Sequence, residues 1–230
     1  MRRTVGLWAL TAVLAVAGVS GCGGGEGPSA DEIVARTAAE TGKVRSFHFV
    51  FAIEHVPTGG TGLSLTFAEG DIVVPNRLRA DVGGTFLGVP LRSQLVVVDG
   101  AYYLKNPLSG KWETIEAKTN PVAFFDPAKG VLGVIKGATD LELTGSEEVD
   151  AVASYRIAGK VKVSDLTALL GNPPSDRLVP VQLWIGEEDY LLRRLRLTGP
   201  VAASEPEDAV RTVEVSNHDE AVTIEPPVQP

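Results

Sequence analysis

Several stretches of the chain alternate between apolar and polar residues, which is the period of a β-strand with one buried face. The clearest is the segment 77–82, in which charged residues take the odd positions and apolar residues take the even ones. Segments 47–53 and 63–67 show the same period. Together the three segments predict one apolar sheet face, formed by Phe47, Phe49, Phe51, Ile53, Leu63, Leu65, Leu78, Ala80 and Val82.

Further strands are predicted by apolar or alternating runs in the rest of the chain. The pair Asp99-Gly100 between two such runs is typical of a tight hairpin turn. The additional predicted strands are 91–98, 101–104, 111–116, 140–149, 152–163, 179–185, 191–198, 210–215 and 222–224.

Three short helices interrupt the predicted strands. The first spans 30–41 and opens with a capping box formed by Ser29 and Glu32. The second is signalled by Asp126-Pro127, and the third begins at Ser164. Because the strands come in runs and do not alternate singly with helices, the order predicts an α+β fold with a large antiparallel sheet.

The N-terminal segment has the layout of an export signal. Two arginines precede an uncharged apolar run over 5–19, which is shorter than the roughly 20 residues that span a bilayer. The run leads into Val19-Ser20-Gly21-Cys22, where small residues flank a thiol, as required by the enzymes that lipidate a cysteine and cut before it. We predict a signal peptide at 1–21 and a lipid-modified Cys22. The alternatives are a cleaved signal with an incidental cysteine and a retained transmembrane anchor.

The remaining chain divides into a tether, one domain and a tail. Residues 22–29 are rich in glycine, which indicates a flexible tether. We predict that residues 30–225 form a single domain and that residues 226–230 form a proline-rich tail. Cys22 is the only cysteine, so no intramolecular disulfide is expected. The lipid anchor would hold the domain at the cell membrane, on its extracytoplasmic face.

Charge and chemistry exclude several functions. The chain has 21 basic and 29 acidic residues, and loss of the signal arginines brings the net charge near −10, which argues against a nucleic-acid partner. His48, His55 and His218 lack the spacing of metal ligands. The carboxylates of Glu187-Glu188-Asp189 are interpreted as a solvated turn, with a hydrolase as the alternative. We therefore predict no enzymatic activity, no metal and no cofactor.

The predicted apolar face has two interpretations. In the first, the helices fill it completely and it is only a core. In the second, small residues on the inner surfaces leave a mostly apolar cavity of ligand size. The small residues concerned are Ala80, Gly83, Gly84, Gly133 and Ala168.

The mature chain resembles the mycobacterial lipoprotein family that includes LprG, LppX, LprA and LprF. Besides the cysteine motif, the resemblance is carried by Gly62-Leu63-Ser64-Leu65, Gly70-Asp71, Val97-Val98-Asp99-Gly100, Tyr103, Phe125-Asp126-Pro127, Gly130-Val131-Leu132, Tyr155-Arg156-Ile157, Gly159-Lys160-Val161, Val179-Pro180-Val181, Leu183-Trp184-Ile185 and the closing 222–227. One departure is Ala151, which stands where glycine is expected.

The resemblance implies a half-barrel sheet wrapped over helices, related to the carriers LolA and LolB. It also implies an apolar cavity that receives acyl chains of lipids or glycolipids for transport in the cell envelope. Carried over to this chain, the lipid-binding residues would be Phe49, Phe51, Leu65, Leu78, Ala80, Val131, Leu132 and Ile135.

A second hypothesis is an anchored adaptor or sensor without lipid. Its partner would be an envelope protein such as a transporter. The contact would be the arginine-rich strand segment Arg193-Arg194-x-Arg196, for which a solvated strand face is the alternative.

Overall fold

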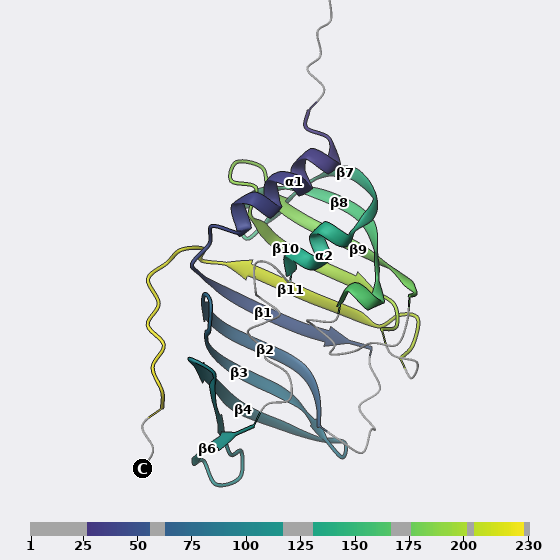
Figure 1. Cartoon of the computed structure of the whole chain (residues 1–230). Coiled ribbons are helices and arrows are strands. Elements are labelled where there is room, and N and C mark those ends of the chain that lie inside the picture. Colours follow the sequence, from purple (N-terminus) through teal and green to yellow (C-terminus); the bar gives the residue numbers. More distant parts are fainter. Residues whose placement is uncertain (1–26, 56–62, 117–130, 167–175, 202–204, 228–230) are drawn as a thin grey trace, which may run out of the picture.

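The computed structural model describes residues 27–55, 63–116, 131–166, 176–201 and 205–227. It contains one antiparallel sheet with the strand order β6-β5-β4-β3-β2-β1-β11-β10-β9-β8-β7 (Figure 1). The strands are β1 (Ser46–Glu54), β2 (Leu63–Val73), β3 (Arg77–Phe86), β4 (Val89–Val98), β5 (Ala101–Lys105), β6 (Trp112–Ile115), β7 (Thr139–Val149), β8 (Val152–Lys162), β9 (Leu178–Gly186), β10 (Leu192–Thr198) and β11 (Val210–Ser216).

The sheet consists of two meanders that meet in the middle. Strands β1 to β6 pair in chain order, as do β7 to β11, and the first and last strands of the chain then pair with each other. In this central pair Phe51 lies opposite Val213, and on its other side Phe51 lies opposite Ala68 of β2. The predicted antiparallel sheet is confirmed, with β2 and β3 longer than the sequence pattern indicated.

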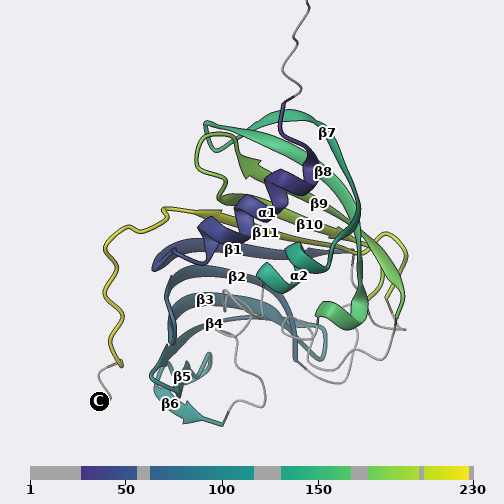
Figure 2. The ribbon, with the colours of Figure 1, turned by 45° about the horizontal axis from the view of Figure 1, so that its top comes forward.

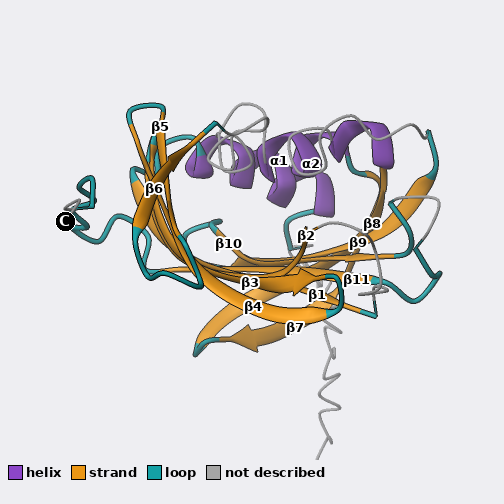
Figure 3. Cartoon of the chain, turned by 90° about the horizontal axis from the view of Figure 1, so that it is seen from below, coloured by secondary structure: helices purple, strands orange, loops and turns teal. Residues whose placement is uncertain are grey.

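Both described α-helices lie on the same face of the sheet. Figures 2 and 3 show α1 (Ala30–Thr41) and α2 (Val131–Gly137) over the concave side, here called the inner face. The predicted first helix is confirmed, and its capping box is present. The start of the predicted second helix lies outside the described residues. The third is represented by the 3-10 helix η2 (Val163–Leu166), and its continuation also lies outside them.

The inner face holds the main hydrophobic core. Ile33 of α1 and Ile135 of α2 are fully buried against it. Thr37 adds a buried hydrogen bond by donating its hydroxyl to the carbonyl oxygen of Ile33 at 2.9 Å. At the side of the core, the Arg36 guanidinium lies 4.9 Å from the centre of the Tyr190 ring. Helix α1 is therefore fixed to the sheet by apolar burial and by cation–π contact.

The predicted strand at 222–224 is wrong. This segment has no strand structure and crosses the outer face of the sheet, opposite the helices. Ile224 is buried there against Val96 and Val98, and its carbonyl oxygen accepts a hydrogen bond from Arg77 at 2.9 Å. The apolar residues of the segment thus pack across β4 instead of pairing along an edge strand.

No helix in the described parts of the chain is both long and apolar enough to cross a membrane. The predicted signal peptide, most of the tether and the end of the tail lie outside the described residues. The helices and strands that the structure describes all fall between Ala30 and Ser216, so a chain that starts at Gly23 retains the whole described fold.

Candidate functional site

The inner face of the β1–β4 half is built from cross-strand rows of apolar side chains. In the first row Phe47 lies opposite Ile72, Ile72 opposite Leu78, and Leu78 opposite Val97. Directly opposed residues in an antiparallel sheet point to the same side. The apolar face that alternation predicts is therefore confirmed as one surface, and β4 extends it.

Burial of this face decreases along the strands toward the β3–β4 turn. All members of the first row are at most 8% exposed. Two rows further on, Phe51 and Val82 are only half-buried, although they still pack against the core. In the next rows Leu65 is 43% exposed and Phe86 46% exposed. The apolar face is thus closed at one end and open at the other.

The residues predicted to bind lipid occupy different parts of this gradient. Phe49, Leu78, Ala80 and Ile135 belong to the core and are nearly inaccessible. Phe51 is half-buried, and Leu65 lies at the open end. Val131 and Leu132 are in α2, but their side chains are outside the described set. The lipid-binding assignment of all eight residues stays a prediction.

Two further apolar residues of β4, not singled out from the sequence, belong to the inner face. Leu91 and Leu95 of β4 are half-buried and share the inner face, since they lie opposite Gly84 and Ala80. They follow the same alternation as β3, so the signal was present in the sequence.

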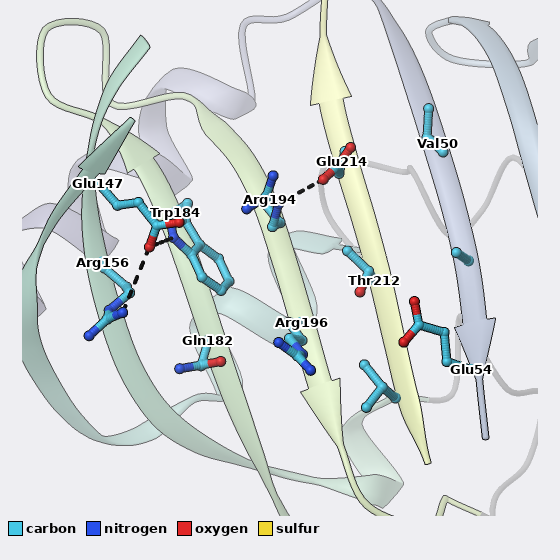
Figure 4. A pocket seen from close by; sticks show the side chains of 12 residues that line it. Val50, Glu54, Glu147, Arg156, Gln182, Trp184, Arg194, Arg196, Thr212 and Glu214 are labelled. Atoms are coloured by element: carbon cyan, nitrogen blue, oxygen red, sulfur yellow. Dashed lines mark hydrogen bonds and ion pairs between the residues drawn. The ribbon is translucent and has the colours of Figure 1, made fainter. Parts of the chain in front are cut away.

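A groove of about 600 Å³ lies on the outer face, over β1 and β7–β11 (Figure 4). Its lining is mostly polar and is tied together by ion pairs and hydrogen bonds. Arg194 pairs with Glu214 at 2.7 Å, and the indole nitrogen of Trp184 donates to Glu147 at 3.1 Å. An acyl chain in this groove would remove water from charged groups without replacing their hydration. The groove therefore suits polar contacts and does not suit lipid tails.

The three arginines of the adaptor hypothesis do not form one surface. Arg194 and Arg196 line the outer groove, with the Arg194 guanidinium 5.4 Å from the Trp184 ring centre. Arg193 is 9% exposed and bonds to Asp189 and, at 3.0 Å, to Nδ1 of His218. Successive residues of a strand face opposite sides of a sheet, and a β-bulge also shifts the register between Leu192 and Arg194, so Arg193 does not line the groove.

The histidines have structural partners. Nδ1 of His48 lies 2.9 Å from Asp71 on the outer face, and Arg79 contacts the same carboxylate at 3.0 Å. Burial raises the pKa of Asp71, but the hydrogen bonds from His48 and Arg79 outweigh it and hold the pKa below its usual value. Burial and the adjacent Arg193 lower the pKa of His218 to about 4. In the described residues no cluster of three metal-ligating side chains occurs.

Comparison with known proteins decides the family. The model of the LppX_LprAFG lipoprotein family matches residues 29–224, nearly the whole described domain. The chain belongs to the LppX_LprAFG family. This is a family of lipoproteins and not of enzymes, and one of its members is named a lipoarabinomannan carrier.

Family members with known names or structures cover most of the chain. The lipoarabinomannan carrier protein LprG of Mycobacterium tuberculosis is 26% identical over 191 residues, covering 78% of this chain and 79% of LprG. The crystal structure of LprF from Mycobacterium bovis has a TM-score of 0.68 at 16% identity, covering 86% of this chain and 96% of that one.

LppX is a further relative of the chain. The crystal structure of LppX from Mycobacterium tuberculosis has a TM-score of 0.61 at 18% identity, covering 84% and 96% of the two chains. In Mycobacterium bovis, LppX is named a phthiocerol dimycocerosate transporter and is 30% identical over 64 residues, covering 28% of this chain and 27% of LppX. The predicted family resemblance and the predicted antiparallel sheet with short helices are thus confirmed, whereas the apolar cavity stays a prediction.

Proposed function

We propose that this lipoprotein binds acyl chains of a lipid or glycolipid on the inner face of its sheet and carries or presents that lipid in the cell envelope. The observation that carries the proposal is the apolar inner face that passes from full burial at Leu78 to 43% exposure at Leu65. Each methylene that moves from water onto such a surface contributes about 0.8 kcal/mol. An acyl chain lying along this gradient would cover the exposed end.

The family membership supports the same function. The names of LprG and LppX describe a lipoarabinomannan carrier and a phthiocerol dimycocerosate transporter. The polar outer groove offers no comparable surface. The inner face is therefore where this chain would hold its ligand.

The first test is the lipid content of the purified protein. The chain from Gly23 onward is expressed in a related envelope-bearing host, weighed by native mass spectrometry, extracted with organic solvent and subjected to lipid analysis. We expect a stoichiometric acylated lipid. A clean apo mass from every host tried would contradict the carrier function and favour the lipid-free adaptor.

A pair of variants tests the position of the ligand. Leu78 is too closely packed to accept a larger side chain, so the filling substitution is placed at the half-buried Val82. We expect Val82→Trp to reduce co-purified lipid severalfold by occupying the space of the acyl chain. Asp81→Trp is the matched control, because Asp81 is the preceding residue of β3 and is exposed on the outer face. Equal lipid content in folded Val82→Trp and Asp81→Trp proteins would refute the inner-face assignment.

We also propose that acylated Cys22 anchors the protein to the extracytoplasmic face of the cell membrane. The signal layout and the motif ending at Cys22 support this proposal. Mass spectrometry of the protein extracted from membranes should find an acylated Cys22 as the first residue. An unmodified cysteine, or a chain that still begins at Met1, would contradict it.

A further inference from the structure

The β3–β4 hairpin turn contains a leucine at a position with left-handed backbone conformation. Its two residues, Leu87 and Gly88, have φ angles of 50° and 78°, so both are in the left-handed region. Leucine rarely adopts this conformation, because its Cβ approaches the following carbonyl group. The Leu87 side chain is also 62% exposed to solvent. The position is therefore unfavourable for leucine in two independent ways.

The next hairpin shows that turn geometry does not require a leucine. Asp99 and Gly100, between β4 and β5, have φ angles of 51° and 87°, which is nearly the same conformation. There the first position carries aspartate, a residue that tolerates the left-handed region and stays hydrated. Something other than turn formation must account for Leu87.

Leu87 belongs to an exposed apolar patch, here called the tip, that consists of Leu87 and its strand neighbours Phe86 and Val89. Phe86 is 46% and Val89 58% exposed, and the segment from 86 to 91 contains no charged residue. The turn at the opposite end of β4, Asp99-Gly100, is polar. The molecule thus presents an apolar tip at the end of the β1–β4 half where β3 turns into β4.

The tip is continuous with the inner face. Phe86 lies opposite Leu63 on one side and opposite Val89 on the other, in the row next to Leu65 and Leu91. Leu65 is the 43% exposed residue at the open end of the apolar gradient. A lipid chain leaving a bilayer at the tip would reach the inner face without crossing a polar surface.

We propose that the tip is a membrane-docking site that inserts Leu87, Phe86 and Val89 into the acyl region of the outer leaflet. This inference rests on the proposed carrier function and adds the place where lipid enters or leaves. Three neutral apolar side chains on a convex turn are too few for a stable protein interface, which buries more than roughly 1,000 Å². They are suited to shallow insertion into a bilayer.

The predicted anchor makes weak insertion sufficient. An eight-residue tether over 22–29 extends to at most about 30 Å, so the domain would stay close to the membrane. A tethered second contact needs little affinity of its own when the tether lets both contacts reach the same bilayer. The tip would then engage and release the bilayer repeatedly while the anchor holds the protein in place.

The experiment measures how the chain from Gly23 onward partitions onto vesicles of neutral phosphatidylcholine. We expect Leu87→Asn to lower the partition coefficient roughly tenfold, because a leucine side chain is lost from the acyl region. Asparagine suits the left-handed turn, so the variant should be at least as stable as the native protein. Leu108→Asn is the matched control, since Leu108 is 91% exposed in the β5–β6 connection and lies outside the tip. It should bind vesicles like the native chain.

A second variant reports the depth of insertion. Leu87→Trp should retain binding, and its fluorescence should be quenched by brominated acyl chains beyond the signal of the native tryptophans. Equal partition of the native chain and Leu87→Asn, or an equal loss in Leu108→Asn, would overturn the proposal. Lipid co-purification with the same proteins is scored separately. A lipid-free native protein would refute the carrier function, whereas vesicle partition alone decides the docking site.

Discussion

At several positions a residue other than glycine has a left-handed backbone conformation, which favours glycine. Asp150 and Ala151 form the turn between β7 and β8, with φ angles of 48° and 63°. Glycine was expected at Ala151 from the family resemblance, and the structure supplies the reason. A residue with a Cβ is strained in this conformation, whereas glycine is not.

Replacing Ala151 with glycine should therefore stabilise the protein. We expect Ala151→Gly to raise the free energy of unfolding by about 1 kcal/mol, because the strain of the left-handed alanine is removed. Urea denaturation measures the change. Ala153→Gly is the control, since Ala153 is an exposed residue inside β8 and glycine there should cost about 0.5–1 kcal/mol. A loss of stability in both variants would contradict the turn geometry.

At the scale of elements, the pairing of β2 with β3 depends on one glycine. Gly70 lies opposite Ala80, and a Cβ built at this position would stand 2.0 Å from the carbonyl oxygen of Arg79. Such contacts do not occur between real atoms, so the two backbones approach more closely here than any side chain allows. This close approach fixes β3 and its inner-face residues relative to β2.

Substitution of Gly70 should disturb this half of the sheet. We expect Gly70→Ala to lower the free energy of unfolding by about 3 kcal/mol, because the strands must separate to accept the methyl group. The matched control is Gly83→Ala in β3, where the nearest side-chain atom would be 3.7 Å away and no strain arises. Thermal unfolding followed by circular dichroism compares them. Similar midpoints for both variants would show that the β2–β3 approach is not tight.

At the scale of the whole molecule, residues near the C-terminus connect both meanders. Asp219 accepts a hydrogen bond from the backbone of Arg45 at 2.7 Å, next to the start of β1. His218 contacts Arg193 of β10, and Ile224 packs over β4. The segment thus joins the β10 side of the sheet to the β4 side, and its integrity should affect global stability.

This arrangement predicts a pH dependence of folding. The pKa of His218 falls from 6.5 to about 4 on folding, so the unfolded chain binds the proton more strongly. The contribution of neutral His218 to the free energy of unfolding is complete above pH 6.5 and decreases as the pH falls toward 4. We expect a loss of about 1–2 kcal/mol between pH 7.5 and pH 5, after allowance for partial solvent exposure.

Urea titrations at the two pH values measure this dependence, and His218→Asn should flatten it. Asp71 does not interfere, because its lowered pKa affects stability only below its ordinary value of 3.8. If the native protein has the same free energy of unfolding at pH 7.5 and pH 5, the pKa of His218 does not change on folding and the prediction is wrong.

The sequence by itself determined the elements and the apolar face. Alternating and apolar runs located the strands of the sheet, and the capping box at Ser29 located α1. These signals are local, because the direction of a side chain follows from its position in a regular backbone. The same local rule assigned Phe49, Leu78 and Ala80 to one surface. The rule also predicted a strand at 222–224, which is wrong, because the apolar residues of that segment pack across the sheet and do not pair with an edge strand.

Only the tertiary structure decided how that surface is used. The pairing of β1 with β11, the burial of Arg193 and the exposure gradient from Leu78 to Leu65 depend on segments far apart in the chain. Burial is a sum over all neighbours in space, and periodicity reports only which side a residue faces. The sequence therefore predicted an apolar wall, while the arrangement of strands and helices decided which end of it is closed and which end opens at Leu87.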